Sequence, residues 1–325
     1  MDDSKTLYIV IPCYNEEEVL MEITNQLKKK ITNLIKNKKI SVNSKVLYVN
    51  DGSKDKTWEI IKKISKKDNL FTGISLAKNS GHQNALLAGL LVSKNYADMV
   101  ISMDADLQDD IDAIDEMIEK YYAGCDIVYG VRKSRKSDSL FKKHTAQLFY
   151  KIMISMGVDI VYNHADYRLT SKRVLDNLED FKETNLFLRG IFPLIGYNSD
   201  IVYYERKKRY AGKTKYPVKK MMDFAWNGIT SFSVKPIQMI RNLGIIILLG
   251  SIIFLLWLII ETILGKTYNI GIYLMGSIWL LGGIQILSLG IVGEYIGKIS
   301  DEVKNRPRYI IDENLINTGD SKNEN

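Results

Sequence analysis

The sequence predicts an α/β domain with a mostly parallel sheet, followed by amphipathic interface helices and a two-helix transmembrane hairpin. Two observations carry this prediction. Short apolar segments alternate with helix-like segments through the first two-thirds of the 325-residue chain, as in sheets covered by helices on both faces. The last third instead holds two long runs without a formal charge, which soluble folds seldom contain.

Four strand-like segments define the predicted sheet. Each is short and apolar and is followed directly by polar residues: 7–11, 46–49, 99–103 and 127–130. We expect Pro12 to end the first strand and a helix to follow from Asn15, because the acidic residues after Asn15 suit the first turn of a helix. In such sheets ligands bind outside the carboxyl ends of the strands. The polar residues after these strands are therefore the candidate site.

The two uncharged runs predict a membrane hairpin. Residues 242–260 and 267–293 contain no Asp, Glu, Lys or Arg, and each run is long enough for a spanning helix, which needs about 20 apolar residues. A pair of buried core helices is the alternative. Because the connector 261–266 is short, both outer ends of the hairpin are expected on one side of the membrane.

Basic residues indicate which side that is. They crowd the segment 207–241 and recur over 298–308, whereas the connector holds only Lys266. The positive-inside rule therefore places both flanks in the cytoplasm, with the hairpin in the cell membrane. Residues 217–240 mix aromatic and aliphatic side chains with lysines, which suits helices lying in the membrane interface; ordinary groove-packed helices are the alternative.

The predicted organisation follows from these patterns. It comprises a cytoplasmic α/β domain over residues 1–216, interface helices over 217–240, two transmembrane helices over 241–297 and a cytoplasmic tail over 298–325. The polar composition from Ile311 onward predicts that the end of the tail is disordered.

Charge and cysteine content exclude several function classes. The net charge of +7 is a mild excess with no nucleic-acid-binding module beside it, so attraction to anionic lipid or phosphate is the better interpretation. The two cysteines, Cys13 and Cys125, have no metal-ligand spacing and indicate no disulfide framework. The N-terminus is too acidic, and its apolar run too short, for a signal peptide.

Asp104 and Asp106 are the central candidates for chemistry. Both follow the buried strand 99–103, where no helix covers the backbone and both carboxylates can reach one hard cation. Mg²⁺ or Mn²⁺ takes oxygen ligands and commonly bridges carboxylates to phosphate oxygens. An ordinary surface loop with two acids is the alternative, but the strand 99–103 has a buried-strand composition, and Leu107, Gln108 and Asp109 continue the site.

Other loops after the strands add candidate contacts. Asp51, in the turn 50–53, could accept hydrogen bonds from a base N–H or from ribose hydroxyls. A plain turn with a helix cap at Asp55 is the alternative, and both can hold at once. His82, in the loop 79–83, is a candidate polar contact, although the sequence shows no partner for it and does not make it catalytic.

The polar segments resemble the motifs of family 2 glycosyltransferases of the GT-A fold, a Rossmann-like fold, and are most similar to polyisoprenyl-phosphate (dolichol- or bactoprenol-phosphate) sugar transferases. The motifs occur in the family's order along nearly the whole chain: Ile11–Glu16, Asn50–Thr57, Asn79–Gln83, Met103–Asp109, Ala165–Leu169, Phe187–Gly190, Tyr204–Arg206, Arg209–Tyr216, Gly293–Gly297 and Arg306–Tyr309. Tyr167 stands where the family usually has Phe, a departure without a clear consequence.

The resemblance implies an inverting transfer of a hexose from a nucleotide sugar to undecaprenyl or another polyisoprenyl phosphate, with Mg²⁺ or Mn²⁺ as cofactor. It implies catalytic roles for Asp104, Asp106 and Asp166, and a metal site of Asp104 and Asp106 supported by Gln108. The nucleotide sugar is expected to contact a set of residues after the strands: Pro12, Tyr14, Glu16, Asp51, Ser53, Gly81, Gln83, Asp104, Ala105 and Asp106.

Asp166 occupies the position that the family proposes as a base, but the chemistry of the acceptor argues for another role. The second pKa of a phosphate monoester lies near ~6, so the acceptor is largely dianionic and already nucleophilic at neutral pH. It needs orientation and charge screening more than deprotonation. Asp166 could instead hold Arg168 or another cation in place.

Cations beside the membrane are expected to hold the lipid phosphate. Arg132 is the first choice, because it follows the strand 127–130 and a guanidinium can grip phosphate with two parallel hydrogen bonds. Further candidates, each of which could equally be a solvated surface charge, are Arg135, Lys142, Lys143, Arg168, Arg206 and Arg209.

Three rival functions make different demands. A processive polysaccharide synthase would carry a Gln-x-x-Arg-Trp motif, and none of the four tryptophans follows an arginine. An inactive membrane scaffold has no need of four placed acids, and a phosphodiester hydrolase would need a water-activating base.

The sugar cannot be read from the sequence, although the loop 79–83 is more similar to bacterial glucosyl and N-acetylglucosaminyl transferases. It therefore favours UDP-glucose or UDP-GlcNAc over GDP-mannose. Expected partners are a second copy of the chain, packed through glycines of the spans, a downstream flippase and a transferase that uses the lipid-linked sugar.

Overall fold

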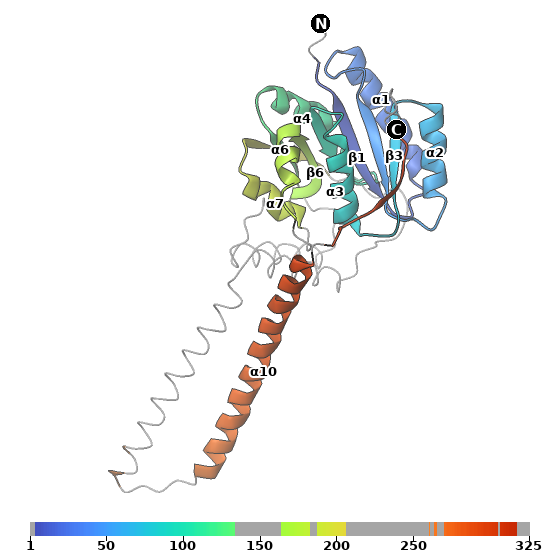
Figure 1. Ribbon diagram of the computed structural model, residues 1–325. Coiled ribbons are helices and arrows are strands. Elements are labelled where there is room, and N and C mark those ends of the chain that lie inside the picture. The colour runs from blue at the N-terminus through green and yellow to red at the C-terminus, as the bar shows by residue number, and fades with distance from the viewer. Residues whose placement is uncertain are drawn as a thin grey trace.

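The computed structural model describes residues 4–133, 164–182, 187–205, 260, 263–264, 270–304 and 306–316. They form an eight-stranded sheet between two layers of helices, with one long helix projecting from the domain (Figure 1). The mostly parallel, GT-A-like α/β fold expected from the sequence is confirmed.

One half of the sheet is a parallel block with an added edge strand. Strands β1 (Leu7–Cys13), β2 (Lys45–Asn50), β3 (Phe71–Leu76) and β4 (Met99–Ser102) lie in the order β3-β2-β1-β4, and β8 (Ile311–Asn314) pairs antiparallel with β3. The sequence did not predict β3, whose residues Phe-Thr-Gly-Ile-Ser-Leu include a glycine and two hydroxyl side chains.

The other half contains β5 (Ile127–Arg132), β6 (His164–Ser171) and β7 (Ser199–Tyr204) in the order β4-β6-β5-β7. Strand β6 is antiparallel to both of its neighbours, whereas β5 and β7 are parallel. The sequence did not predict β6 because its composition is mixed and polar. Its antiparallel direction places its amino end beside the carboxyl ends of β4 and β5.

Strand β1 continues through Pro12 to Cys13, so the prediction that Pro12 ends it is wrong. Pairing with β2 runs on to Cys13, but pairing with β4 stops at Val10. The carbonyl of Cys13 accepts a hydrogen bond from the N–H of Asp51, which follows β2. The carbonyl of Val10 accepts one from the N–H of Met103, which follows β4. Pro12 therefore faces the side where β4 has ended, and its missing N–H breaks no ladder bond.

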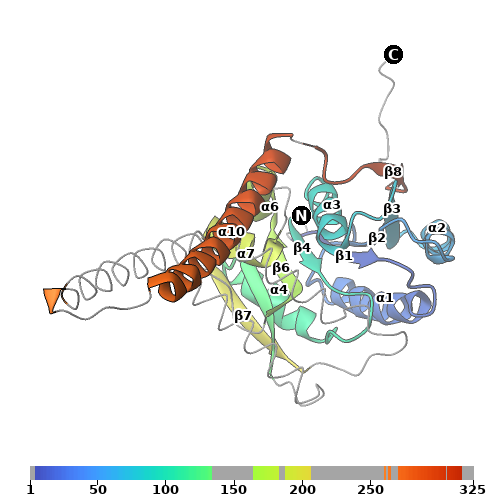
Figure 2. The same cartoon turned by 90° about the horizontal axis from the view of Figure 1, so that it is seen from below.

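Helices cover both faces, as predicted. One face carries α1 (Leu20–Lys36), α2 (Thr57–Lys67) and α4 (Ala113–Tyr122), and the other carries α3 (His82–Ser93), α6 (Lys172–Leu178) and α7 (Leu188–Ile195). Figure 2 shows α1 and α3 on opposite sides of the sheet. Helix α1 begins later than predicted, because Asn15 has a φ of 53° and a turn precedes Leu20.

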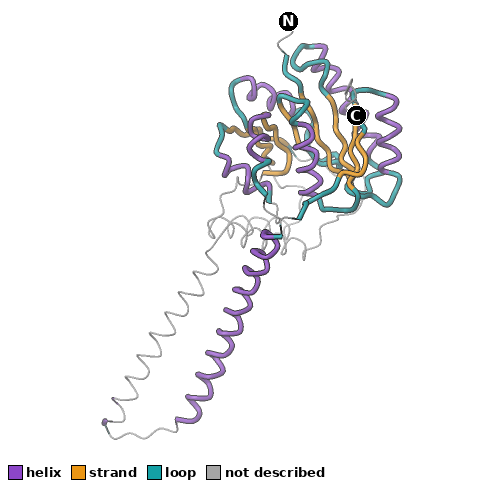
Figure 3. The backbone as a smooth tube through the Cα atoms, viewed as in Figure 1, coloured by secondary structure: helices purple, strands orange, loops and turns teal. Residues whose placement is uncertain are grey.

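Helix α10 (Ile270–Val303) projects from the end of the domain opposite the N-terminus and is continuous in the tube view (Figures 1 and 3). It contains most of the second uncharged run, and many of its apolar side chains are exposed, including Leu289 and Ile296. Among the described residues, no helix meets the combined length and hydropathy of a membrane span. Residues 217–240 and nearly all of the first run lie outside the described residues, so the hairpin and interface helices stay predictions.

Residues 311–316 are ordered, so the prediction of a disordered tail from Ile311 is wrong for them. The backbone of β8 pairs with the edge of β3. Glu313 accepts a hydrogen bond from Trp58 Nε1 at 2.9 Å and forms an ion pair of 2.7 Å with Lys62. Ile316 is 8% exposed. A polar segment can order in this way because backbone pairing at a sheet edge does not require apolar side chains.

Candidate active site

The polar residues that follow the strands meet at one edge of the sheet. Asp51 follows β2, Asp104 follows β4, and Arg132 ends β5. Asp166 reaches the same edge from β6: Ser102 of β4 pairs with Arg168, so Asp166 comes level with Asp104 two residues further along. The hydroxyl of Ser102 fixes this register by donating to the carbonyl of Asp166 at 2.5 Å.

The loop after β4 holds Asp104 and Asp106 in a constrained turn. Leu107 adopts a φ of 58°, a left-handed conformation that is uncommon for residues other than glycine. The N–H of Gln108 donates to Asp106 Oδ1 at 3.1 Å, and the N–H of Asp104 donates to Asp109 Oδ2 at 3.3 Å. This strained, internally bonded loop keeps both predicted metal ligands at the sheet edge.

Asp109 continues the site, as the sequence predicted, but no role or partner was predicted for it. Its side chain is buried, and its other oxygen accepts the hydroxyl of Tyr204 from β7 at 2.6 Å. Tyr204 also accepts a hydrogen bond from Arg132 Nε at 3.4 Å. Asp109 therefore connects the aspartate loop to the far half of the sheet, a link that the sequence signalled only by the acid at the end of the Asp-Ala-Asp-Leu-Gln-Asp segment.

The carboxylates at this edge lie close enough together to affect one another. Burial raises the pKa of Asp104, and the charges of Asp106 and Asp166 add to the rise. Burial and the charge of Asp104 likewise raise the pKa of Asp109 to about 6. Such a cluster favours a bound cation, which would offset the repulsion between the acids.

The donor types fit a hard divalent ion. Asp104 and Asp106 offer carboxylate oxygens, Gln108 lies partly buried on the same loop, and Mg²⁺ and Mn²⁺ combine such oxygens with phosphate oxygens. In the part of the chain that the structure describes, no group of three His, Cys, Asp or Glu side chains is arranged to hold a metal.

Asp166 is surrounded by donors. Arg168 Nη2 lies 2.8 Å from its Oδ1, and Arg189 donates from Nε at 3.2 Å to Oδ1 and from Nη2 at 3.1 Å to Oδ2. Gln83 Nε2 lies 3.3 Å from Oδ2. The hypothesis that Asp166 holds Arg168 in place is confirmed, and Arg189, on α7, is a second partner that the sequence did not identify.

These donors fix the charge of Asp166. Burial by itself raises the pKa of this carboxyl, but the guanidinium of Arg189 and the neighbouring cationic groups outweigh burial and hold the pKa well below its usual value. A carboxylate that resists protonation so strongly is a weak base. The geometry therefore favours an orienting role for Asp166 over proton abstraction.

His82 gains the partners that the sequence could not show. Its Nε2 lies 3.6 Å from Asp104 Oδ1 and 3.5 Å from Asp166 Oδ2, so the imidazole bridges the two acids. Gln83, the next residue, accepts the N–H of Leu188 at 3.2 Å and so ties the start of α3 to the start of α7.

Asp51 holds the loop that carries His82. Its carboxylate accepts the N–H of Ser80 at 2.6 Å and that of Gly81 at 3.1 Å. Gly52 has a φ of 61°, and a Cβ there would come within 2.5 Å of the Asn79 nitrogen, so only glycine allows this close approach. The predicted contact of Asp51 with a nucleotide stays a prediction.

The remaining candidates near β1 lie beside the turn after β2. The N–H of Asn15 donates to Ser53 Oγ at 3.0 Å, and the N–H of Glu16 donates to Thr57 Oγ1 at 2.9 Å. Tyr14 and Glu16 are half-buried, Ala105 is buried in the aspartate loop, and Pro12 is buried within β1. The strand-end loops are thus joined as one surface.

The predicted phosphate ligands divide into three groups. Arg132 is half-buried at the end of β5, beside the acids. Arg168 is fully buried with its guanidinium 4.2 Å from the Phe192 ring, so the prediction that it binds lipid phosphate does not fit its position. The others lie outside the described residues: Arg135, Lys142, Lys143, Arg206 and Arg209.

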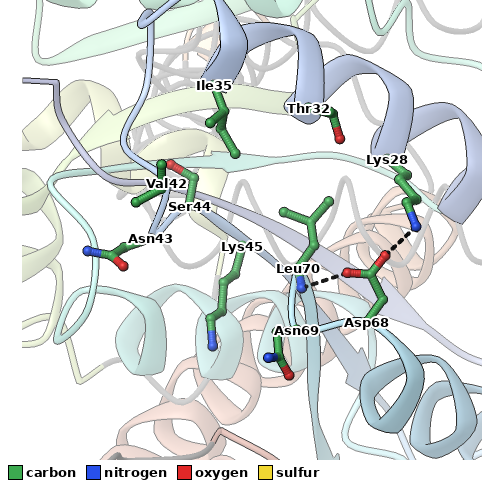
Figure 4. Close-up of a pocket in the computed structure, with 10 residues that line it drawn as sticks. All are labelled: Lys28, Thr32, Ile35, Val42, Asn43, Ser44, Lys45, Asp68, Asn69 and Leu70. Atoms are coloured by element: carbon green, nitrogen blue, oxygen red, sulfur yellow. Dashed lines mark hydrogen bonds and ion pairs between the residues drawn. The ribbon is translucent and has the colours of Figure 1, made fainter.

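A pocket of about 560 Å³ lies elsewhere, near the amino ends of β2 and β3 (Figure 4). Lys28 and Asp68 form an ion pair of 2.7 Å at its rim, and Leu70 and Val42 contribute apolar wall. None of the predicted site residues lines it, and it opens at the opposite end of the strands from the acids.

Comparisons with known proteins agree with the motifs. The family model described as Glycosyl transferase family 2 matches residues 8–179. The chain is 53% identical over 311 residues to an uncharacterized glycosyltransferase, YkoT, of Bacillus subtilis (strain 168), covering 96% of this chain and 92% of the relative. It is 38% identical over 305 residues to the SfII prophage-derived bactoprenol glucosyl transferase of Shigella flexneri, covering 93% and 96%.

A solved structure is also similar. Glucosyl-3-phosphoglycerate synthase from Mycobacterium tuberculosis, in complex with Mn²⁺, UDP-glucose and phosphoglyceric acid, matches with a TM-score of 0.46 and 15% identity, covering 70% of this chain and 78% of that chain.

Proposed function

The chain belongs to glycosyl transferase family 2, and from this premise we propose that it transfers a hexose from a nucleotide sugar to a polyisoprenyl phosphate. The relative from Shigella flexneri is named for glucosyl transfer to bactoprenol and is similar along nearly the whole chain. The observation that carries the proposal is the meeting of the Asp104 loop with Asp166 and two arginines at one sheet edge.

The donor half of the proposal concerns the aspartate loop. Asp104 and Asp106, supported by Gln108, would hold Mg²⁺ or Mn²⁺, which when bound neutralises charge on the diphosphate leaving group. Asp51 and the loop residues Tyr14, Glu16 and Ser53 would line the nucleotide. The raised pKa of Asp104 supports this assignment, because the charge of a bound cation would offset the repulsion between the neighbouring carboxylates.

The acceptor half concerns the arginines. A phosphate oxygen of the lipid would attack the anomeric carbon from the face opposite the leaving group, which inverts the configuration. Arg132 would orient that phosphate and screen its charge. Since the phosphate is largely dianionic above a pKa of ~6, the site needs no strong base, in keeping with the lowered pKa of Asp166.

The proposal places the chain in the cell membrane, with the α/β domain in the cytoplasm. Its support is the pair of uncharged runs 242–260 and 267–293, the basic residues that flank them, and the exposed apolar side chains along α10. Residues 217–240 would lie in the interface. A second copy of the chain, a flippase and a transferase that uses the lipid-linked sugar would be partners of this activity.

UDP-glucose or UDP-GlcNAc is the proposed donor, and GDP-mannose is the alternative. The test is a panel of radiolabelled UDP- and GDP-sugars, each incubated with the purified full chain, Mg²⁺ or Mn²⁺ and undecaprenyl phosphate. Label in a chloroform-soluble, mild-acid-labile product is the expected result, with one donor preferred. Label only in water-soluble free sugar would refute transfer to lipid and indicate hydrolysis.

A further inference from the structure

Three charged side chains form a linked group within the candidate site. Asp166 lies between Arg168 and Arg189 and hydrogen-bonds both. One negative and two positive charges leave the group with a net positive charge. The group can bind an anion only where this positive charge is exposed to solvent.

The two arginines differ in exposure. The side chain of Arg168 is 0% exposed, stacks on Phe192 and has two nitrogens, Nε and Nη1, with no hydrogen-bond acceptor among the residues that the structure describes. The side chain of Arg189 is 26% exposed. Arg168 is therefore a buried counter-charge for Asp166, and the surplus positive charge reaches the site through Arg189.

The position of Arg189 is fixed from two sides. Asp166 binds Nε and Nη2 with both of its oxygens, the planar fork geometry that a carboxylate and a guanidinium share. Leu188, the residue before Arg189, donates its backbone N–H to Gln83, and Gln83 also contacts Asp166. The guanidinium is thus oriented in advance, which lowers the entropy cost of gripping a ligand.

Side-chain contacts place Arg189 close to the reacting centre. Asp166 Oδ2, which accepts a hydrogen bond from Arg189 Nη2 at 3.1 Å, also lies 3.5 Å from His82 Nε2, and that nitrogen lies 3.6 Å from Asp104 Oδ1. The positive charges of Arg189 and Arg132 disfavour each other. Two positive charges close to the proposed metal ligands favour the binding of an anion there.

On the basis of the proposed function, we propose that Arg189 is a phosphate-binding residue of the reacting centre and that Asp166 is the positioning residue that aims it. Arg189 would grip a phosphate oxyanion of the acceptor lipid or of the donor diphosphate, together with Arg132. Asp166 would then act through Arg189 and would not take up the proton of the acceptor.

The test uses the detergent-solubilised full chain with the variants Arg189→Ala and Arg189→Lys. Equilibrium binding is measured for farnesyl phosphate, a short prenyl phosphate, and separately for UDP. Arg189→Ala should weaken binding of one of them about 10- to 100-fold, as expected for loss of a charge-assisted contact. Arg189→Lys should weaken it less, since the charge remains but the fork is lost. Weakening of farnesyl phosphate assigns Arg189 to the acceptor, and weakening of UDP assigns it to the donor.

Arg173→Ala is the matched control. Arg173 also pairs with a buried aspartate, Asp126, but at the opposite end of β5. The Arg173→Ala variant should bind farnesyl phosphate and UDP with wild-type affinity. Added guanidinium should restore part of the transfer activity of Arg189→Ala, which a purely structural role would not allow. Unchanged binding of both ligands by a folded Arg189→Ala variant would overturn the inference.

Asp166→Asn tests the positioning role. Placed in the Arg189→Ala background it should weaken phosphate binding little further, because the two residues act as one unit. Independent, additive losses would overturn that role. Ligand binding is measured without sugar transfer. If the wild type transfers sugar to lipid but the variants bind both ligands with wild-type affinity, only this inference fails. A wild type that transfers no sugar to lipid defeats the proposed function alone.

Discussion

The two halves of the sheet place their site residues in different ways. In the parallel half, β1, β2 and β4 each end in a loop that carries its own polar residues, so position in the sequence and position in space agree. In the other half, Asp166 lies within β6 and reaches the site only because that strand runs antiparallel. In the first half the loop after β4 leaves Asp104 and Asp106 half-buried, although Asp51 and Asp109 are buried. In the other half, Asp166 and Arg168 are both buried and depend on each other.

The largest expected effect is a loss of activity, without loss of stability, when an acid of the parallel half is substituted. Asp104→Asn should reduce sugar transfer at least ~100-fold, because loss of a charge from the proposed metal site would remove stabilisation of the leaving group. The side chain is partly exposed and the amide has the same shape, so the melting temperature should stay near that of wild type. Transfer of radiolabelled sugar into lipid and thermal unfolding are the measurements.

The control for that substitution is Asp115→Asn on α4, a surface acid paired with Lys30 and Lys39. It should transfer sugar at the wild-type rate. Wild-type turnover in Asp104→Asn, or turnover of the native chain that EDTA leaves unaffected, would contradict the metal assignment.

Stability should respond most strongly in the other half. Asp166→Asn removes the counter-charge of the fully buried Arg168, and breaking a buried pair in this way costs about 3–5 kcal/mol of the free energy of unfolding. Chemical denaturation in detergent measures the loss. A change below ~1 kcal/mol would mean that the two halves do not differ in this respect.

The C-terminal edge strand should show a smaller effect. Ile316→Ala removes a buried side chain that packs with the core of the sheet, at an expected cost of about 2 kcal/mol. Ile310→Ala, at a position 59% exposed, is the control and should change stability by less than ~0.5 kcal/mol. Equal effects of the two substitutions would show that docking of this segment contributes nothing beyond its backbone pairing with β3.

The smallest effect is expected at Asp126, whose pKa is lowered mainly by its hydrogen bonds with Arg173. A lowered folded-state pKa stabilises the fold above the unfolded value and loses that contribution as pH falls through the folded value. Because Arg173 is 61% exposed, solvent screening limits the contribution to about 1 kcal/mol or less. The difference in unfolding free energy between wild type and Asp126→Asn should be present at pH 7 and shrink below the usual aspartate pKa of 3.8. A difference that grows in acid would reverse the assigned sign.

Much of the fold could be read from local patterns, and the errors have identifiable causes. The strands β1, β2, β4 and β5 are apolar runs followed by polar loops, so composition alone located them. Strands β3, β6 and β8 have mixed composition, and they are strands because neighbouring edges pair with their backbones. No pattern within the segment 311–316 distinguishes it from a disordered tail.

The sequence by itself determined the aspartate loop after β4, the turn after β2 and the family, because these depend on short segments with fixed spacing. The tertiary structure decided which charges meet. It buried Arg168 under Phe192, brought Arg189 from α7 onto Asp166, and joined Tyr204 of β7 to Asp109. These pairings link residues up to 95 positions apart. They follow from strand direction, register and the need of buried charges for partners, none of which a local segment encodes.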